Sequence, residues 1–234
     1  MIYRTYAEIE RKVRLDLDLQ EETFITSEEL LGYANEAINE AEAEIHTIYE
    51  DYFLTFGYVP LVNGTELYDL PSAIYANKIR AIIYENGSNT VYTIDRLREP
   101  GKFELERLAN QNQGTDWYQY MLINNAAATI SASPQMLLIP TPREDLTPGI
   151  KVWYLRNANR MIDDTSVCDI PEFVEFVIQY IKVRCYEKEG HPNIQFARVD
   201  MERHRTFMRD TLSNRVPDDD TKIPLDLSTY YESS

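Results

Sequence analysis

The chain has 234 residues, 44% of them hydrophobic, so it can bury a sizeable core as one large domain or two smaller ones. Its formal net charge of -16 argues against a protein that grips nucleic acid, because such proteins gain affinity by placing Lys and Arg on phosphates. An acidic wall still lets DNA slide past, and the lack of an apolar run near 18 residues or of a leader predicts no membrane association.

Two helices joined by a short link are expected at the start of the chain. The first is predicted from about residue 6 to 19, with Thr5 and Glu8 spaced as a capping box. The second is predicted from 26 to 56, with Thr26 and Glu29 as its capping box. The short link predicts that the two helices are antiparallel neighbours.

The long second helix is the element around which we expect the chain to be organised. Its apolar residues recur at spacings of three and four, which makes a narrow stripe suited to packing against another helix. We call this stripe the seam; it consists of Leu31, Ala34, Ile38, Ala41, Ile45 and Ile48. At about 1.5 Å per residue the helix would be about 45 Å long, and the two alanines allow a partner helix to approach closely.

After Gly57 the pattern changes to short alternating runs separated by turn residues, which predicts strands. We expect hairpins that turn at 63–64 and at 86–87, with one helical turn over 71–76 between them. The segment 96–110 is predicted to be helical, and prolines at 140 and 142 predict an exposed edge for the strand before them. The expected strands are 58–62, 65–70, 78–84, 90–94, 117–123, 129–131, 135–140 and 150–156.

The chain then returns to helix. Pro171 in a first turn, with Asp169 as the expected cap, opens a helix that ends at Gly190. A last helix from about residue 193 to 212 makes an αα-hairpin with it. From Val216 the periodicity stops, and the tail is either a disordered terminus or an arm that adds to a neighbouring subunit. The tail residues that we expect at an interface are Ile223, Leu225, Leu227, Tyr230 and Tyr231.

Together these elements predict an α+β fold. It comprises a bundle of about four helices, an inserted antiparallel β domain that is a sandwich or a small barrel, and an extended C-terminal arm. The first half of the bundle is expected in 1–57, the β domain in 58–163, the helical hairpin in 164–215 and the arm in 216–234.

Signatures of catalysis and of cofactor binding are missing from the sequence. It has no glycine-rich phosphate or dinucleotide loop, no His-Glu-x-x-His and no Gly-x-Ser-x-Gly. His46 has no second ligand at helical spacing and is expected at the boundary of the bundle. Cys168 and Cys185 are isolated, which predicts reduced thiols. We therefore expect no enzyme, no metal and no cofactor.

Several strings, taken in order, resemble the head-to-tail adaptors of tailed phages, the tail tubular protein A-like connectors. They are YAEI at 6–9, ITSEELL at 25–31 with YANEA at 33–37, LYDLPS at 67–72 before KIR at 78–80, and IPEF at 170–173. The resemblance implies a structural virion protein, assembled in the host cytoplasm, whose copies form a ring, usually twelvefold. Such a ring lies below the portal protein, connects it to a tail or nozzle protein, and lets DNA pass without specific binding.

A second class of function also fits the charge. An acidic interaction module, such as a DNA mimic that inhibits a nucleic-acid-binding protein, would bind a basic partner through its carboxylates. The 17 tyrosines suit interfaces of either kind. A mimic needs neither a β insertion nor a tyrosine-ended arm, and we expect it to stay small, whereas an adaptor forms or joins a ring.

Overall fold

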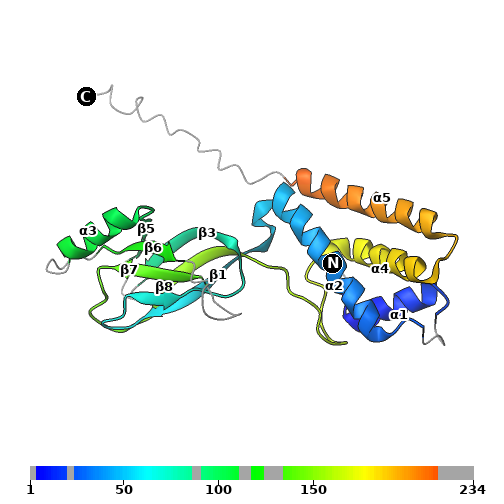
Figure 1. Ribbon diagram of the computed structural model, residues 1–234, viewed down its shortest axis with the longest axis horizontal. Helices are drawn as coiled ribbons and strands as arrows, with labels where there is room; N and C mark the ends of the chain where they lie inside the picture. Colours follow the sequence, from blue (N-terminus) through cyan, green and yellow to red (C-terminus); the bar gives the residue numbers. More distant parts are fainter. Residues whose placement is uncertain (1–3, 20–23, 86–90, 111–116, 124–133, 216–234) are drawn as a thin grey trace, which may run out of the picture.

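A computed structural model describes residues 4–19, 24–85, 91–110, 117–123 and 134–215 of the chain. The molecule is elongated, with a helical part at one end and a β part at the other (Figure 1). The helical part contains α1 (Tyr6–Asp16), α2 (Ser27–Ile48), α4 (Val174–Glu189) and α5 (Ile194–Ser213). A fifth helix, α3 (Pro100–Asn110), lies with the strands. The predicted α+β class is confirmed.

Both predicted helix starts in the N-terminal region are confirmed. The Thr5 hydroxyl accepts a hydrogen bond from the Glu8 amide while the Glu8 carboxylate accepts one from the Thr5 amide. Thr26 and Glu29 make the same reciprocal pair at the start of α2. Each box satisfies amides that would otherwise lack a partner in the first helical turn.

The predicted end of the long helix at Phe56 is wrong. α2 ends at Ile48, because Tyr49 leaves helical geometry with φ -135° and ψ 84°, and a 3₁₀ turn over Glu50–Phe53 leads directly into a strand. The segment from 49 to 56 is rich in aromatic residues, which lose side-chain freedom in a helix and suit a strand. The helix is therefore about 33 Å long at 1.5 Å per residue.

Two four-stranded sheets enclose an apolar core in the β part. The first has the order β1-β8-β3-β4 and is fully antiparallel. The second has the order β2-β7-β6-β5, in which β5 and β6 run parallel. The strands are β1 (Leu54–Leu61), β2 (Leu67–Asp69), β3 (Ile74–Glu85), β4 (Val91–Thr93), β5 (Asp95–Arg96), β6 (Gln119–Ile123), β7 (Gln135–Ile139) and β8 (Leu146–Arg156).

The expected hairpin around Asn63 and Gly64 is wrong, although the turn itself is present. Gly64 has the left-handed φ of 75° that this turn favours. The turn nevertheless passes the chain from one sheet to the other, since β1 pairs with β8 and β2 pairs with β7. Burial on the shared core, which connects residues far apart in sequence, overrides the local turn signal.

The second expected hairpin is confirmed in its strands, which pair Tyr84 with Tyr92; its turn at 86–87 lies outside the described residues. The helical turn expected over 71–76 is wrong, because β3 already begins at Ile74 and bulges where Ala76 and Asn77 take positive φ. The edge predicted for the strand before Pro140 is wrong too, because β7 lies between β2 and β6. The strand expected at 129–131 lies outside the described residues.

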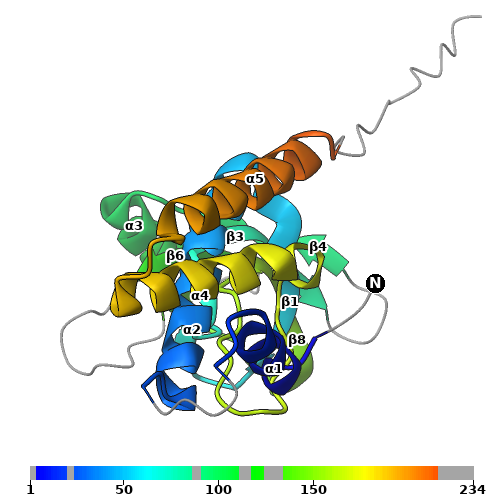
Figure 2. The ribbon, with the colours of Figure 1, turned by 90° about the vertical axis from the view of Figure 1, so that its right-hand side faces the viewer.

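The return to helix begins at Pro171 as predicted, with a 3₁₀ turn over Pro171–Phe173 before α4. Asp169 is not the cap. Its carboxylate instead pairs with the Arg156 guanidinium at the end of β8 and accepts the Asn159 amide at 2.7 Å. Gly190 ends α4 in the left-handed region with φ 66°, as a C-terminal glycine does. Viewed along the long axis, α4 lies between α5 and α1 (Figure 2).

Candidate interaction surfaces

The seam of α2 lies inside the subunit. Ala34, Ile38, Ala41 and Ile45 are all 0% exposed, whereas Leu31 and Ile48 are partly buried against the same core. The buried face is wider than the seam and also takes in Leu30 and Ala37. These two residues belong to a second row at the same three and four residue spacing, which is the signal that could have found them.

Two polar residues of α2 hold the segment that returns from the β part. Glu42 accepts the Ala158 amide at 2.7 Å and the Arg160 guanidinium at 2.8 Å. The side-chain amide of Asn35 binds both backbone groups of Met161, at 2.8 and 2.9 Å. Sequence reasoning missed this role. Its only signal is the seven-residue spacing, which places Asn35 and Glu42 on the same face of the helix.

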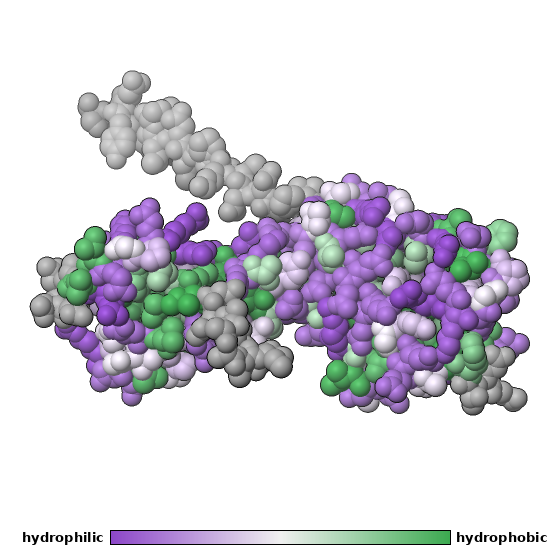
Figure 3. Space-filling model, in the orientation of Figure 1, coloured by the Kyte–Doolittle hydropathy of each residue, from purple (hydrophilic) through white to green (hydrophobic). Residues whose placement is uncertain are grey.

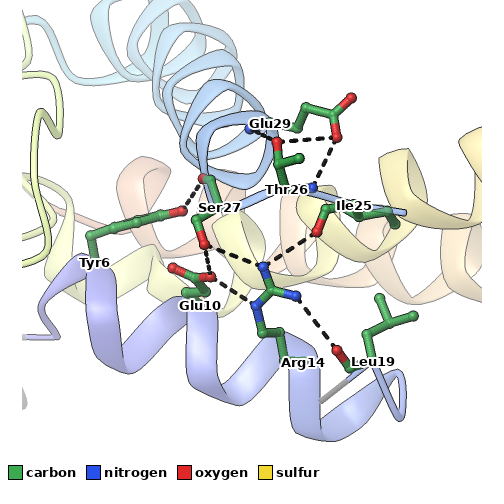
Figure 4. A network of polar contacts seen from close by, with 8 residues as sticks. All are labelled: Tyr6, Glu10, Arg14, Leu19, Ile25, Thr26, Ser27 and Glu29. Carbon is green, nitrogen blue, oxygen red and sulfur yellow. Dashed lines mark hydrogen bonds and ion pairs between the residues drawn. The ribbon is translucent and has the colours of Figure 1, made fainter. Parts of the chain in front are cut away.

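A polar network joins α1 to the start of α2 (Figure 4). The Arg14 guanidinium donates to Glu10 at 2.8 Å and reaches the Ser27 hydroxyl at 3.3 Å, and that hydroxyl donates to Glu10 at 2.7 Å. Burial alone would raise the pKa of Glu10, but these hydrogen bonds hold it below the ordinary value. The Tyr6 hydroxyl donates to the Ser27 carbonyl at 2.5 Å. The angle between α1 and α2 is thus fixed by partners on both helices.

The glutamates that flank the seam bind basic residues of α4 and α5. Glu36 pairs with Arg184 at 2.7 Å, and Glu44 pairs with Arg209 at 3.0 Å. Glu40 and Glu44 both contact Arg205, whose side chain is largely buried. Much of the acidity of α2 is therefore neutralised within the subunit, where it helps to hold the helices together.

The junction between the two parts contains a buried histidine. His46 is 5% exposed, and its ring stacks on Tyr75 of β3 with centroids 3.8 Å apart. Burial lowers the pKa of His46 below its ordinary value of 6.5. Beside it, Glu50 accepts Lys78 at 2.6 Å and Arg80 at 2.5 Å, so the 3₁₀ turn is tied to β3. His46 was expected at the boundary of the helical bundle, and it lies at the junction between the helical and β parts.

Aromatic residues cover the outer side of β1 and β8. Phe56 lies opposite Trp153 in the register, and Tyr58 lies opposite Lys151. The Lys151 ammonium sits 4.1 Å from the Phe56 ring centroid, 4.9 Å from that of Trp153 and 5.8 Å from that of Tyr58. We call Phe56, Tyr58, Lys151 and Trp153 the aromatic face.

The aromatic face is open to solvent. Phe56 is 45% exposed and Tyr58 48% exposed, while Lys151 makes no ion pair within the described part of the chain. On the side of the molecule drawn in Figure 3, hydrophobic side chains gather over the β part, whereas the helical part is mostly hydrophilic. Exposed aromatic residues around a cation are the composition of interaction hot spots.

A second exposed apolar row lies on α5. Phe196 is 74% exposed and Phe207 59% exposed, and Val199 lies on the same side of the helix. On the other side of the helix, Met208 and Leu212 are buried. The interface residues predicted in the C-terminal tail lie outside the described residues; they are Ile223, Leu225, Leu227, Tyr230 and Tyr231.

The described residues give little support for a metal site or for a reactive nucleophile. They contain no group of three or more His, Cys, Asp or Glu side chains arranged to hold a metal ion. Cys168 and Cys185 are free and buried, and burial raises their pKa values to about 11 and about 12. A thiol that stays protonated is a poor nucleophile.

Comparisons with known proteins bear on identity. The family model described as SU10 adaptor protein matches residues 4–224, which include both parts of the fold. No curated protein matches the chain. Among the helices that the structure describes, none combines the length and the apolar character needed to span a membrane.

Proposed function

Because the chain belongs to the SU10 adaptor protein family of phage head-to-tail adaptors, we propose that its copies form a ring below the portal and connect the portal to the tail. As a member of this family the protein is a structural component of the phage virion. The family match over residues 4–224 is the observation that carries the proposal.

The shape of the subunit supports a connecting role. Its helical and β parts lie at opposite ends of an elongated molecule (Figure 1), so one subunit can contact different partners at its two ends. We propose residues 1–57 with 164–215 as one functional unit and 58–163 as the other, one facing the portal and one the tail or nozzle protein. The C-terminal segment of the chain, 216–234, is proposed to contact a neighbouring subunit or the portal through the five positions named above.

The charge supports a channel through which DNA passes without being bound. A formal charge of -16 per subunit is multiplied by every copy in a ring, which we propose to be twelvefold. Carboxylates on the inner wall would repel phosphates, so the genome could slide during ejection. The same charge favours the alternative of an acidic module that binds a basic partner.

Assembly state separates these two functions. We expect the purified chain, alone or mixed with the portal protein of its phage, to give a ring or a portal-bound ring by native mass spectrometry and electron microscopy. A matched sample that lacks residues 216–234 tests the role of the tail, since its loss should abolish ring or portal association. A chain that stays monomeric with the portal, yet binds a basic protein, would favour the DNA-mimic function.

A further inference from the structure

The aromatic face borders an unpaired strand edge. β1 is the terminal strand of its sheet and pairs only with β8 among the described strands. Its outward side chains, Leu54, Phe56 and Tyr58, are all exposed apolar or aromatic residues, without the charges that usually protect an edge strand. An extended segment could therefore lie along β1 and cover the aromatic face at the same time.

The described chain ends close to this strand. The Arg215 guanidinium, just after α5, lies 5.1 Å from the Tyr52 ring centroid, and Tyr52 is two residues before β1. Figure 1 shows the end of α5 beside the point where α2 leads into the β part. Nineteen residues follow Arg215. At about 3.3 to 3.6 Å per extended residue, residue 223 can lie about 26 to 29 Å from Arg215, which is ample to reach a sheet beside the junction.

The composition of this last segment complements the aromatic face. Ile223, Leu225 and Leu227 alternate with Pro224 and Asp226, so an extended chain would direct the three apolar side chains to one side. The segment 216–234 carries five carboxylate side chains and one lysine. The aromatic face offers rings for the apolar residues, and its cation, Lys151, which makes no ion pair among the described residues, attracts a segment that is acidic overall.

We propose that the aromatic face is the docking site for residues 223–231 of a neighbouring copy of this chain. The inference rests on the proposed function, since it needs copies held side by side. A segment bound to its own sheet would add nothing to a ring. The same segment bound to the next copy ties each subunit to its neighbour through two different surfaces, which is the heterologous contact that a closed ring requires.

Disulfide trapping between two full-length chains tests the proposal. One chain carries Leu54→Cys, at the start of β1, and a second chain with a different tag carries Thr229→Cys, on the same side of an extended segment as Leu225 and Leu227. Both changes leave the aromatic face and the apolar tail residues intact, and the native cysteines are buried. The control replaces Leu54→Cys with Leu105→Cys, at an exposed apolar position on α3. Mild oxidation should give about tenfold more mixed disulfide with Leu54→Cys than with the control.

Two changes at Lys151 make the test specific. Lys151→Glu in the first chain sets a carboxylate against the acidic segment and should lower the yield of mixed disulfide about tenfold, whereas Lys151→Arg, which keeps the positive charge, should leave the yield unchanged. A yield no higher than that of the Leu105→Cys control would overturn the inference. So would an internal disulfide without any mixed product in a chain that carries both cysteines, at a concentration at which rings are present, because this would place the segment on its own sheet.

The two levels of proposal fail in different ways. Rings without the mixed disulfide would remove the docking site and leave the adaptor function standing. A mixed disulfide without rings or portal complexes would keep the docking site and remove the proposed function. A segment that is trapped only by the portal would also overturn the docking site.

Discussion

Replacing Ala41 by leucine tests whether the seam is internal. Ala41 is 0% exposed within a single subunit, so the three added carbons must displace packed neighbours. Such overpacking costs about 1 to 3 kcal/mol. Ala43, two residues away on the same helix, is exposed, so Ala43→Leu makes the same chemical change with an expected effect within about 0.5 kcal/mol.

Adding Ala34→Leu strengthens the test. Ala34 is also 0% exposed and lies about 10.5 Å along the helix from Ala41, far enough for the two costs to add nearly independently. The double variant should lose about 2 to 6 kcal/mol, a large share of the 5 to 15 kcal/mol of a typical domain. Each kcal/mol corresponds to about 2 to 4 °C in melting temperature for a chain of this size.

Urea unfolding followed by circular dichroism, with native mass spectrometry at the same concentration, gives the answer. Both buried-site variants should shift the unfolding midpoint downward, while Ala43→Leu should not. The reasoning is refuted if the double variant unfolds at the wild-type midpoint but no longer assembles, because the seam would then face a neighbouring subunit.

Three further expectations concern the buried polar groups. Glu42→Ala leaves the Ala158 amide and the Arg160 guanidinium without their acceptor, which should cost about 2 to 4 kcal/mol in urea unfolding, against less than about 1 kcal/mol for exposed Glu28→Ala. Because burial lowers the pKa of His46, the unfolded chain binds that proton more readily, so stability should be full above about pH 6.5 and fall as pH drops below it. The charges of Glu42 and Glu50 oppose this lowering of the pKa, and that of Lys78 adds to it. In His46→Phe the urea unfolding midpoint should depend less on pH between about pH 5 and 7.5 than in the wild type. An unchanged pH dependence would mean that another group titrates. Thiol titration at pH 8 should find Cys168 and Cys185 unreactive in the native protein and both reactive in urea, and rapid native labelling would contradict their burial.

Local signals in the sequence were enough to predict the helix starts. A capping box depends on residues three apart, and both boxes form with the predicted partners. The end of α2 could not be predicted in this way. The apolar spacing of the helix continues from Tyr49 to Phe56 in the sequence. In the structure, however, Phe53 joins the core of the helical part, and Leu54 pairs with Leu155, about a hundred positions away in the chain.

Strand pairing explains the other misses. The Asn63–Gly64 turn is a strong local signal for a hairpin, but the partner of each flanking strand is chosen by burial against distant residues. The aromatic face was out of reach for the same reason, because Phe56 and Trp153 become neighbours only through the β1–β8 pairing. The interface positions chosen in the tail stay a prediction.

The entry and exit of the β part lie on the same pair of strands. The chain enters at Leu54 and leaves after Leu155, and these two residues face each other in the β1–β8 register, so their Cα atoms are about 5 Å apart. The hundred residues between them therefore leave the helical part and return to it at nearly the same point, as a short loop would. Such a piece can be lengthened, shortened or exchanged without moving α2 or α4, so the β part can change in evolution while the helical part stays as it is.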